Sequence, residues 1–415
     1  MSKNNNIPRL RFPEFTGEWE EKRLEDVFEF RNGYTPSKTN LKYWNGGNIP
    51  WFKLEDIREK GNILNNSNLH ITNHAVKGGG LFKANSIIVA TSATIGEHAL
   101  IKVAHLANQR FTNLYPKSNF VNLIDMMYAF YYMFIVDEIC KTILNIGNFA
   151  SVNMSSFSRI PFLIPSLPEQ QKIASCLTEM DNLISAQGQR VEALKEKKKG
   201  LMQQLFPQNG ETTPRLRFPG FDGEWGKKPL SYFLFEHKTK SDGKCEVHSV
   251  SVSKGVINQL VYLGRSFAAA DTSKYNLAKP NDIIYTKSPT GDFPYGIVKM
   301  NKNPYNVIVS PLYAVYSPIN KYIGYILDSY FESSANTNNY LSSLIQKGAK
   351  NTIQISNTTF VSKSICLPEN PSEQKAIAEC LSELDNLIAA ESDKLENLKK
   401  YKKGLMQQLF PQPVK

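Results

Sequence analysis

Two blocks of this 415-residue sequence are each present twice, and the copies lie far apart in the chain. PRLRFPEFTGEW begins at Pro8, and PRLRFPGFDGEW begins at Pro214. A longer pair of segments, which begin at Glu169 and Glu373, aligns without a gap for forty residues. Both of these copies include GLMQQLFPQ unchanged. The period is far longer than the roughly 20–50 residues of a solenoid repeat, so the pattern indicates duplication of a large unit.

The segments between these blocks do not match each other. Tyr34–Phe162 and Thr239–Ile365 show no residue-by-residue similarity. One part of the duplicated unit has therefore stayed fixed while the other has diverged. We expect the fixed parts to contact each other or the same partner twice, and the variable parts to contact two different targets. At roughly 100–200 residues per domain, the length allows two or three domains.

The longer repeated block has the seam of a coiled coil, with positions spaced alternately four and three residues apart. In the first copy the seam is Ile173, Leu177, Met180, Ile184, Gln187, Val191, Leu194, Lys198, Leu201 and Leu205. In the second copy it is Ile377, Leu381, Leu384, Ile388, Glu391, Leu395, Leu398, Lys402, Leu405 and Leu409. This period predicts a left-handed coiled coil, and the matching polar interruptions are expected to fix its register.

Capping and helix-breaking residues mark the ends of both predicted helices. Ser166 precedes Glu169 by three residues, the spacing of a capping box, and Ser372 can cap the second helix. Pro207 and Pro411 are expected to end the helices. A helix of this length spans about 57 Å.

The charges along the two helices predict that they pair in opposite directions. The first half of each is acidic or neutral, with Asp181 and Asp385 as examples, and the second half is rich in lysine. Parallel pairing places lysine beside lysine, whereas antiparallel pairing places each basic end beside an acidic one. We therefore expect an antiparallel pair with approximate two-fold symmetry. In the alternative, each helix is only the C-terminal helix of an independent domain.

Both variable segments are expected to be mixed α/β globules. The predicted strands are Ser86–Ala90, Ala99–Val103, Asp282–Tyr285, Ile297–Lys299 and Val307–Val309. The predicted helices are Leu123–Ile143, Tyr322–Phe331 and Tyr340–Ile345. The aromatic run Tyr128–Phe134 is interpreted as core rather than as a base-stacking surface.

The charge of the chain favours a polyanionic partner. The net charge is +11 and the pI about 9.2, which suits nucleic acid or an anionic membrane surface. The longest apolar run, Met126–Val136, is too short to span a bilayer. The five scattered cysteines are expected to be free thiols in a reducing cytoplasm, where we place the protein.

Sequence motifs of catalysis and metal binding are weak. The sequence has neither a Walker A loop nor a GxSxG elbow. Asn303-Pro-Tyr305 only partly matches an adenine-methyltransferase motif, and His70 and His74 lack a third metal ligand at a matching spacing. We therefore expect no catalytic activity, no metal and no cofactor in this chain.

The layout resembles the specificity subunit of type I restriction-modification systems. The resemblance rests on the tandem duplication, on Pro165-Ser-Leu-Pro-Glu-Gln170 and on the helix that ends in Gly-Leu-Met-Gln-Gln-Leu-Phe. Gly33-Tyr-Thr-Pro-Ser37, Ala93-Thr-Ile-Gly96 and Asn108-Gln-Arg-Phe111 fit as well. The second variable segment departs from these loop patterns and has Tyr285-Thr-Lys-Ser288 and Ser310-Pro-Leu-Tyr313.

The resemblance implies an α+β architecture in which two target recognition domains are joined by two long antiparallel coiled-coil helices. The expected boundaries are residues 1–165 and 214–366 for the recognition domains, 166–208 and 367–415 for the helices, and 209–213 for a linker. Each domain is then expected to read one half of a split double-stranded DNA site. The helices set the spacer and dock two modification subunits, and restriction subunits complete the complex. S-adenosylmethionine, ATP and magnesium are expected on those partners.

Polar and basic loop residues are the predicted DNA contacts, because their side chains are the types that hydrogen-bond base edges and phosphates. They are Ser37, Lys38, Thr91, Ser92, Gln109 and Arg110 in the first domain, and Lys254, Thr286, Lys287, Ser288 and Lys350 in the second. Two other readings remain: a two-headed coiled-coil scaffold that binds proteins, and a nuclease with an unrecognised site.

Overall fold

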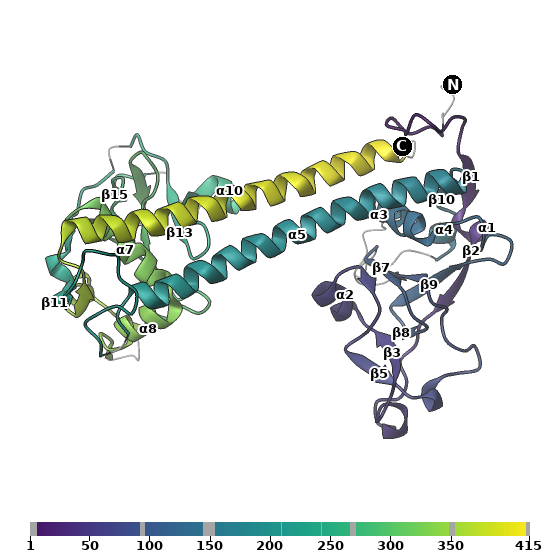
Figure 1. Cartoon of the computed structure of the whole chain (residues 1–415), viewed down its shortest axis with the longest axis horizontal. Helices are drawn as coiled ribbons and strands as arrows, with labels where there is room; N and C mark the ends of the chain where they lie inside the picture. The colour runs from purple at the N-terminus through teal and green to yellow at the C-terminus, as the bar shows by residue number, and fades with distance from the viewer. Residues whose placement is uncertain are drawn as a thin grey trace. The chain divides into compact units, whose positions relative to one another are not determined.

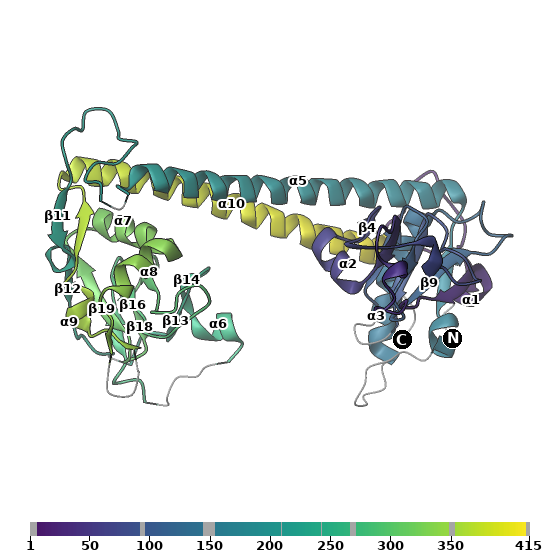
Figure 2. The same ribbon diagram turned by 90° about the horizontal axis from the view of Figure 1, so that it is seen from below.

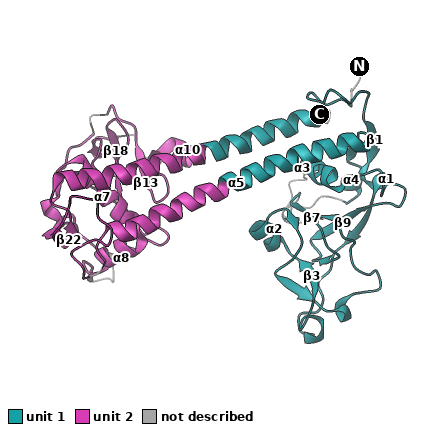
Figure 3. Ribbon diagram, viewed as in Figure 1, with its two compact units in different colours: residues 1–187, 394–415 teal, residues 188–393 magenta. Residues whose placement is uncertain are grey.

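We analysed a computed structural model of the chain, which describes residues 6–91, 96–143, 154–208, 210–241, 243–265, 271–347 and 353–411. The chain forms two compact units (Figure 3). Unit 1 comprises residues 1–187 and 394–415, and unit 2 comprises residues 188–393. Each unit therefore contains one globular part together with a portion of each long helix.

The two long helices are α5, Leu167–Leu205, and α10, Pro371–Leu409. Both end just before the predicted proline stops. Every predicted seam position is buried or half-buried. Within unit 1 the start of α5 lies beside the end of α10, and within unit 2 the start of α10 lies beside the end of α5 (Figures 1 and 2). The antiparallel prediction is confirmed, and the alternative of two independent C-terminal helices is wrong.

The α5 helix begins directly after Ser166, as predicted, but the contacts of Glu169 and the cap of α10 differ from those expected. The carboxylate of Glu169 accepts hydrogen bonds from Arg11 and Trp19, so its role differs from that in a capping box. In α10 the cap comes from Asn370, whose Oδ1 accepts a hydrogen bond from the Ser372 amide at 2.9 Å. Ser372 is itself inside the first turn, because the helix begins at Pro371, two residues earlier than a cap at Ser372 would place it.

The globular part of unit 1 is built on two sheets. The larger has the order β2-β9-β6-β7-β4 and the smaller the order β5-β3-β8, while β1 pairs with β10. The strands are β1 (Glu20–Arg23), β2 (Phe28–Asn32), β3 (Ile49–Phe52), β4 (Ile63–Leu64), β5 (Leu69–Ile71), β6 (Ser86–Ala90), β7 (His98–Ile101), β8 (Leu106–Ala107), β9 (Phe111–Pro116) and β10 (Pro161–Ile164). The helices are α1 (Leu24–Val27), α2 (Leu54–Lys60), α3 (Met126–Ile143) and α4 (Met154–Ser158), with 3₁₀ turns at Leu41–Tyr43 and Asn73–Ala75.

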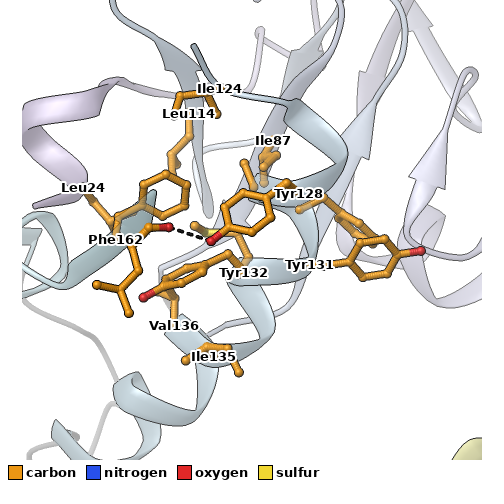
Figure 4. Packing of buried hydrophobic residues seen from close by; sticks show 14 of the residues in the cluster. Leu24, Ile87, Leu114, Ile124, Tyr128, Tyr131, Tyr132, Ile135, Val136 and Phe162 are labelled. Atoms are coloured by element: carbon orange, nitrogen blue, oxygen red, sulfur yellow. Dashed lines mark hydrogen bonds between the residues drawn. The ribbon is translucent and has the colours of Figure 1, made fainter. Parts of the chain in front are cut away.

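The aromatic run on α3 fills one of the two hydrophobic core clusters that the structure describes in unit 1, as predicted (Figure 4). The Tyr128 and Tyr131 side chains are fully buried. The Tyr128 hydroxyl donates a hydrogen bond to the Leu163 carbonyl at 2.6 Å, which satisfies its one polar group. Leu409 and Phe410, at the end of α10, belong to the same core. The last turn of the chain therefore completes the hydrophobic core of the first globular part.

Unit 2 has a central sheet of order β12-β19-β16-β17 and several short strand pairs. The strands are β11 (Gly226–Pro229), β12 (Leu234–Glu236), β13 (His248–Ser251), β14 (Gly255–Asn258), β15 (Asn276–Ala278), β16 (Ile283–Tyr285), β17 (Val298–Met300), β18 (Val307–Val309), β19 (Ala314–Pro318), β20 (Gln346–Lys347), β21 (Ile353–Gln354) and β22 (Ser364–Leu367). The helices are α6 (Gln259–Leu263), α7 (Lys321–Glu332), α8 (Ser334–Ser342) and α9 (Asn357–Phe360), with a 3₁₀ turn at Leu230–Tyr232.

Sequence and structure agree on the strands of unit 2 better than on its helices. The three predicted strands are present within one residue of their expected ends, and α7 matches its prediction closely. The predicted helix Tyr340–Ile345 is wrong, because α8 ends at Ser342 and the chain then turns. The core of unit 2 includes Leu205 and Phe206 from the end of α5, as that of unit 1 includes the end of α10. In the described part of the chain, no helix has the length and apolar character needed to cross a membrane.

Candidate nucleic-acid surfaces and their helical frame

A buried glutamate ties the start of each long helix to its globular part in the same way. In unit 1 the Arg11 Nε lies 2.8 Å from Glu169 Oε1, and the Trp19 indole donates to the same oxygen at 3.2 Å. The second guanidinium contact of Arg11 makes the pair bidentate. Both carboxylate oxygens are thus satisfied, as burial of a charge requires.

Unit 2 repeats this contact with its own residues. The Arg217 Nε lies 2.7 Å from Glu373 Oε1, and Trp225 donates to that oxygen at 3.2 Å. The hydrogen bond to Glu373 raises the pKa of Arg217 above its ordinary value. The Arg and Trp come from the shorter repeated block, so the two repeated blocks contact each other in both units.

A second repeated contact joins the two long helices within each unit. In unit 1 the Lys402 Nζ lies 2.5 Å from Asp181 Oδ1, and the Tyr131 hydroxyl donates to Asp181 at 2.8 Å. In unit 2 the Lys198 Nζ lies 2.6 Å from Asp385 Oδ1. Because Lys198 and Lys402 are two of the four predicted polar seam positions, these pairs align the helices at one register.

In unit 2, further charged residues lie around the ion pair between Lys198 and Asp385. Burial alone raises the pKa of Asp385, but hydrogen bonds from Lys198 and Tyr325 outweigh it, and the pKa is lowered. The Lys198 Nζ also lies 2.5 Å from Glu332 on α7. The Lys302 Nζ lies 2.8 Å from Asp328 on α7 and 3.5 Å from Asp385 on α10. The helix pair of unit 2 is therefore bound to its globular part through a network of ion pairs.

The loops predicted to contact DNA in unit 1 converge at one place. The Gly33 amide donates to Phe111 at 2.8 Å, and the Tyr34 amide donates to Ala107 at 2.8 Å. A Cβ on Gly33 would lie 2.2 Å from the Asn108 carbonyl oxygen, so only glycine allows the two strands of backbone to approach this closely. The Thr35 hydroxyl donates to the side-chain oxygen of Gln109.

The third loop joins the same group. The Thr91 amide donates to the Arg110 carbonyl at 3.1 Å. Ser37, Lys38, Gln109 and Arg110 are exposed, and Thr91 is half-buried. Ser92 lies outside the described residues. The structure thus brings together those predicted DNA contacts of unit 1 that it describes.

A cavity of about 270 Å³ lies among these loops. Lys38, Gln109 and Arg110 line it together with Trp51 and Lys53. Sequence reasoning missed Lys53, which is in a segment without a loop pattern and enters the group only because β3 ends there. Three cations and two amide side chains at one cavity can bind phosphate oxygens and base edges. The Glu55 carboxylate, 3.8 Å from the Lys53 Nζ, is the acidic member of the lining.

In unit 2 the predicted contacts divide into exposed and buried residues. Lys287 and Ser288 are exposed in the loop after β16, and Lys254 is exposed in the turn between β13 and β14. Thr286 is only 3% exposed, and its hydroxyl accepts a hydrogen bond from the Ile297 amide at 3.1 Å. Its side chain therefore supports the loop from inside and cannot reach a base in this conformation. Lys350 lies outside the described residues.

Among the described residues, no group of three or more His, Cys, Asp or Glu side chains is placed to hold a metal ion. The His70 Nε2 lies 2.7 Å from Asn66 Oδ1, and His74 is exposed on a 3₁₀ turn. The side chains gathered at the unit 1 loops are hydrogen-bonding and cationic groups, which suit recognition of a polyanion.

Comparison with known proteins agrees with this arrangement. A family model described as the type I restriction modification DNA specificity domain matches residues 16–196 and 233–400. The type I restriction enzyme EcoprrI specificity subunit of Escherichia coli is 54% identical over 142 residues, which are 34% of this chain and 35% of that protein. This chain thus spans about a third of that relative's length.

Two further similarities extend over nearly the whole chain. The type I restriction enzyme MjaVIII specificity subunit of Methanocaldococcus jannaschii is 23% identical over 97% of this chain and 93% of its own. The crystal structure of the type I restriction-modification system S subunit from M. genitalium has a TM-score of 0.58 at 12% identity, and covers 98% of this chain and 100% of that chain. At that identity the structural similarity concerns the fold.

Proposed function

This chain belongs to the family of type I restriction-modification DNA specificity domains, and we propose that it reads a split DNA site, one half with each unit. In this proposal the two recognition domains are residues 1–165 and 214–366. The helices that set the spacer are residues 166–208 and 367–415. Residues 209–213 link the first helix to the second recognition domain.

One observation carries the proposal: the same contacts hold two different loop surfaces. The ion pairs Arg11–Glu169 and Arg217–Glu373 attach the globular part of each unit to its long helix in the same way, and we call this repeated attachment the frame. The loops of the two globular parts differ in sequence. A frame that is fixed while its loops vary is what a reader of two unlike half-sites at a set spacing requires. The excess positive charge adds affinity through release of counterions from DNA.

The repeated helices are the surfaces that we assign to two copies of a modification subunit, because one partner bound twice needs two equivalent sites. Restriction subunits then join the complex. We assign methyl transfer with S-adenosylmethionine, and cleavage with ATP and magnesium, to those partners. This chain contributes sequence recognition and no catalytic group.

The test is a map of adenine methylation in a host that carries this chain with its modification subunit. A motif split by an unread spacer is expected, and a single unbroken motif would contradict the proposal. The protein-binding scaffold predicts no DNA affinity of this kind. Binding of the complex to DNA should also weaken steeply as salt rises, since phosphate contacts dominate the affinity.

A further inference from the structure

The short helix α6 of unit 2 exposes a run of apolar side chains. Leu260 is 60% exposed, Val261 77%, Tyr262 44% and Leu263 43%. Single exposed apolar residues are ordinary, but a contiguous group marks a contact surface. The turn itself is well capped, because the Asn258 side chain accepts a hydrogen bond from the Val261 amide at 3.1 Å and Gly264 closes it in a left-handed conformation. The apolar group is therefore presented by an ordered element.

Basic residues lie beside this apolar group. The Ser251 hydroxyl donates to the Tyr262 hydroxyl at 3.2 Å and accepts from the Lys254 amide at 3.4 Å, so α6 packs against the lysine turn. Exposed Arg265 follows the helix after Gly264. The neighbouring acid is Glu246, whose carboxylate accepts a hydrogen bond from the Asn258 side-chain nitrogen at 2.7 Å. An apolar turn flanked by cations is complementary to a groove of DNA, where apolar groups on the bases lie between two lines of phosphates.

The position of α6 in the duplicated chain favours DNA over a protein as its partner. A protein bound equivalently by both halves is expected to use the repeated blocks, whereas α6 falls within Thr239–Ile365, which has no counterpart in the first half. It packs on the β13–β14 hairpin of unit 2, at the side of the unit away from α10 (Figure 2). The two variable segments differ in sequence, and so do the bases of the two half-sites. We therefore expect elements of the variable segments, such as α6, to contact the bases.

We propose that α6 enters the major groove of the half-site read by unit 2 and that Val261 contacts the C5-methyl group of a thymine there. This inference rests on the proposed function and specifies the chemistry of one half-site. The thymine methyl is the apolar group that bases present in the major groove, and that groove is wide enough for a helix. Burial of one methyl corresponds to about fourfold in affinity, or about 0.8 kcal/mol.

The experiment replaces each thymine of that half-site in turn by deoxyuridine, which lacks only the methyl group. Binding of the complex of this chain with its modification subunit is measured on each duplex. The wild-type complex should lose about fourfold at one thymine. With Val261→Ser, binding to the thymine duplex should be weaker and replacement at that position should have no further effect. Ile319→Ser, which also replaces an aliphatic residue by serine at a 41% exposed position of the same unit, should keep the wild-type ratio.

Three results overturn the inference. The first is a half-site composed only of G·C pairs. The second is a thymine-to-uridine ratio that Val261→Ser leaves unchanged. The third is a variant that binds the modification subunit less well and discriminates thymine as before, which would make α6 a protein-docking surface. All three leave the proposed function intact, because the complex still binds a split site; failure to bind any specific duplex would instead contradict the proposed function itself.

Discussion

Lys198 of α5 and Asp385 of α10 form an ion pair, with 2.6 Å between Nζ and Oδ1, that Lys402 and Asp181 repeat in the other unit at 2.5 Å. Each pair joins a basic position late in one helix to an acidic position early in the other. A partly buried ion pair of this kind is lost if the helices shift along each other, so it specifies their register more than it adds stability. The same register in both units is what a fixed spacer demands.

Removing Lys198 should therefore destabilise unit 2. Its side chain is only 8% exposed, and Lys198→Ala leaves Asp385 and Glu332 without their shared cation. Because both carboxylates keep some exposure, we expect a loss of about 2 kcal/mol in the free energy of unfolding, below the full value for a buried pair. Denaturant titration measures it. Lys199→Ala, which breaks an exposed contact with Glu196, should cost no more than about 0.5 kcal/mol, and an equal effect of both variants would refute the argument.

Phe410→Ala should destabilise the N-terminal globular part although the residue lies near the end of the chain. Phe410 is 1% exposed, and its ring lies 5.7 Å from the rings of Tyr128 and Tyr132 and 6.4 Å from that of Trp19. The expected cost is about 3–5 kcal/mol. Hydrogen exchange should quicken in α3 and remain unchanged in the sheet of unit 2.

The matched variant Phe206→Ala should reverse this pattern. Phe206 is 3% exposed in the core of unit 2, where its ring lies 5.6 Å from that of Tyr330. Faster exchange in both units with either variant would show that the two cores are not separate.

Unit 1 should lose stability as the pH falls from about 6.5 to about 4. Burial lowers the pKa of His105 from 6.5 to about 4, and its hydrogen bond to the Val103 carbonyl only partly offsets this. Below pH 6.5 the unfolded chain binds a proton that the folded state excludes, so the free energy of unfolding decreases until the pH reaches the folded pKa. The full effect is about 3 kcal/mol.

His105→Phe should remove this share of the pH dependence, since the ring lies between those of Phe52 and Phe82 and can be replaced by another aromatic ring. Denaturant unfolding at several pH values is the measurement, and exposed His74→Phe is the control. A pH slope that His105→Phe leaves unaltered would rule out His105 as its source.

Arg110→Ala should relax one base position in one half-site, at a cost of about 1–3 kcal/mol for the correct sequence. Lys38→Ala should weaken binding evenly across sequences and lower the salt slope by about one. These expectations follow from the gathering of both residues at the unit 1 cavity. Methylation mapping and salt titration distinguish the two effects. Lys22→Ala, on β1 and outside both the loops and the long helices, should change neither, and full specificity of Arg110→Ala at both half-sites would exclude a base contact.

The long helices could be predicted from sequence because their signal is local and periodic. A spacing of four and three residues determines a seam without knowledge of the rest of the fold, and the charges along it indicate direction. The pairing of Arg11 and Trp19 with Glu169 could not be predicted in the same way, since the partners lie far apart in the chain. The one available signal was that all three residues recur together in the second half of the chain.

The candidate site was predictable in its residue types and less so in its surroundings. Loop composition identified Lys38, Gln109 and Arg110, but only the folded chain shows that Lys53 joins them. Thr286 follows a strand and looks like a loop residue in the sequence. In the folded chain Gly296 lies so close that a Cβ on Gly296 would be 1.9 Å from the Thr286 carbonyl oxygen. The Thr286 side chain is therefore buried. Burial of this kind depends on tertiary packing, which a polar side chain in a sequence does not reveal.

The most direct measurement exchanges residues 34–162 for the corresponding segment of a chain with a different site and maps adenine methylation again. If each unit reads one half-site on a common frame, one half of the motif should change while the other half and the spacer length stay the same. A change in both halves, or in the spacer, would contradict the account.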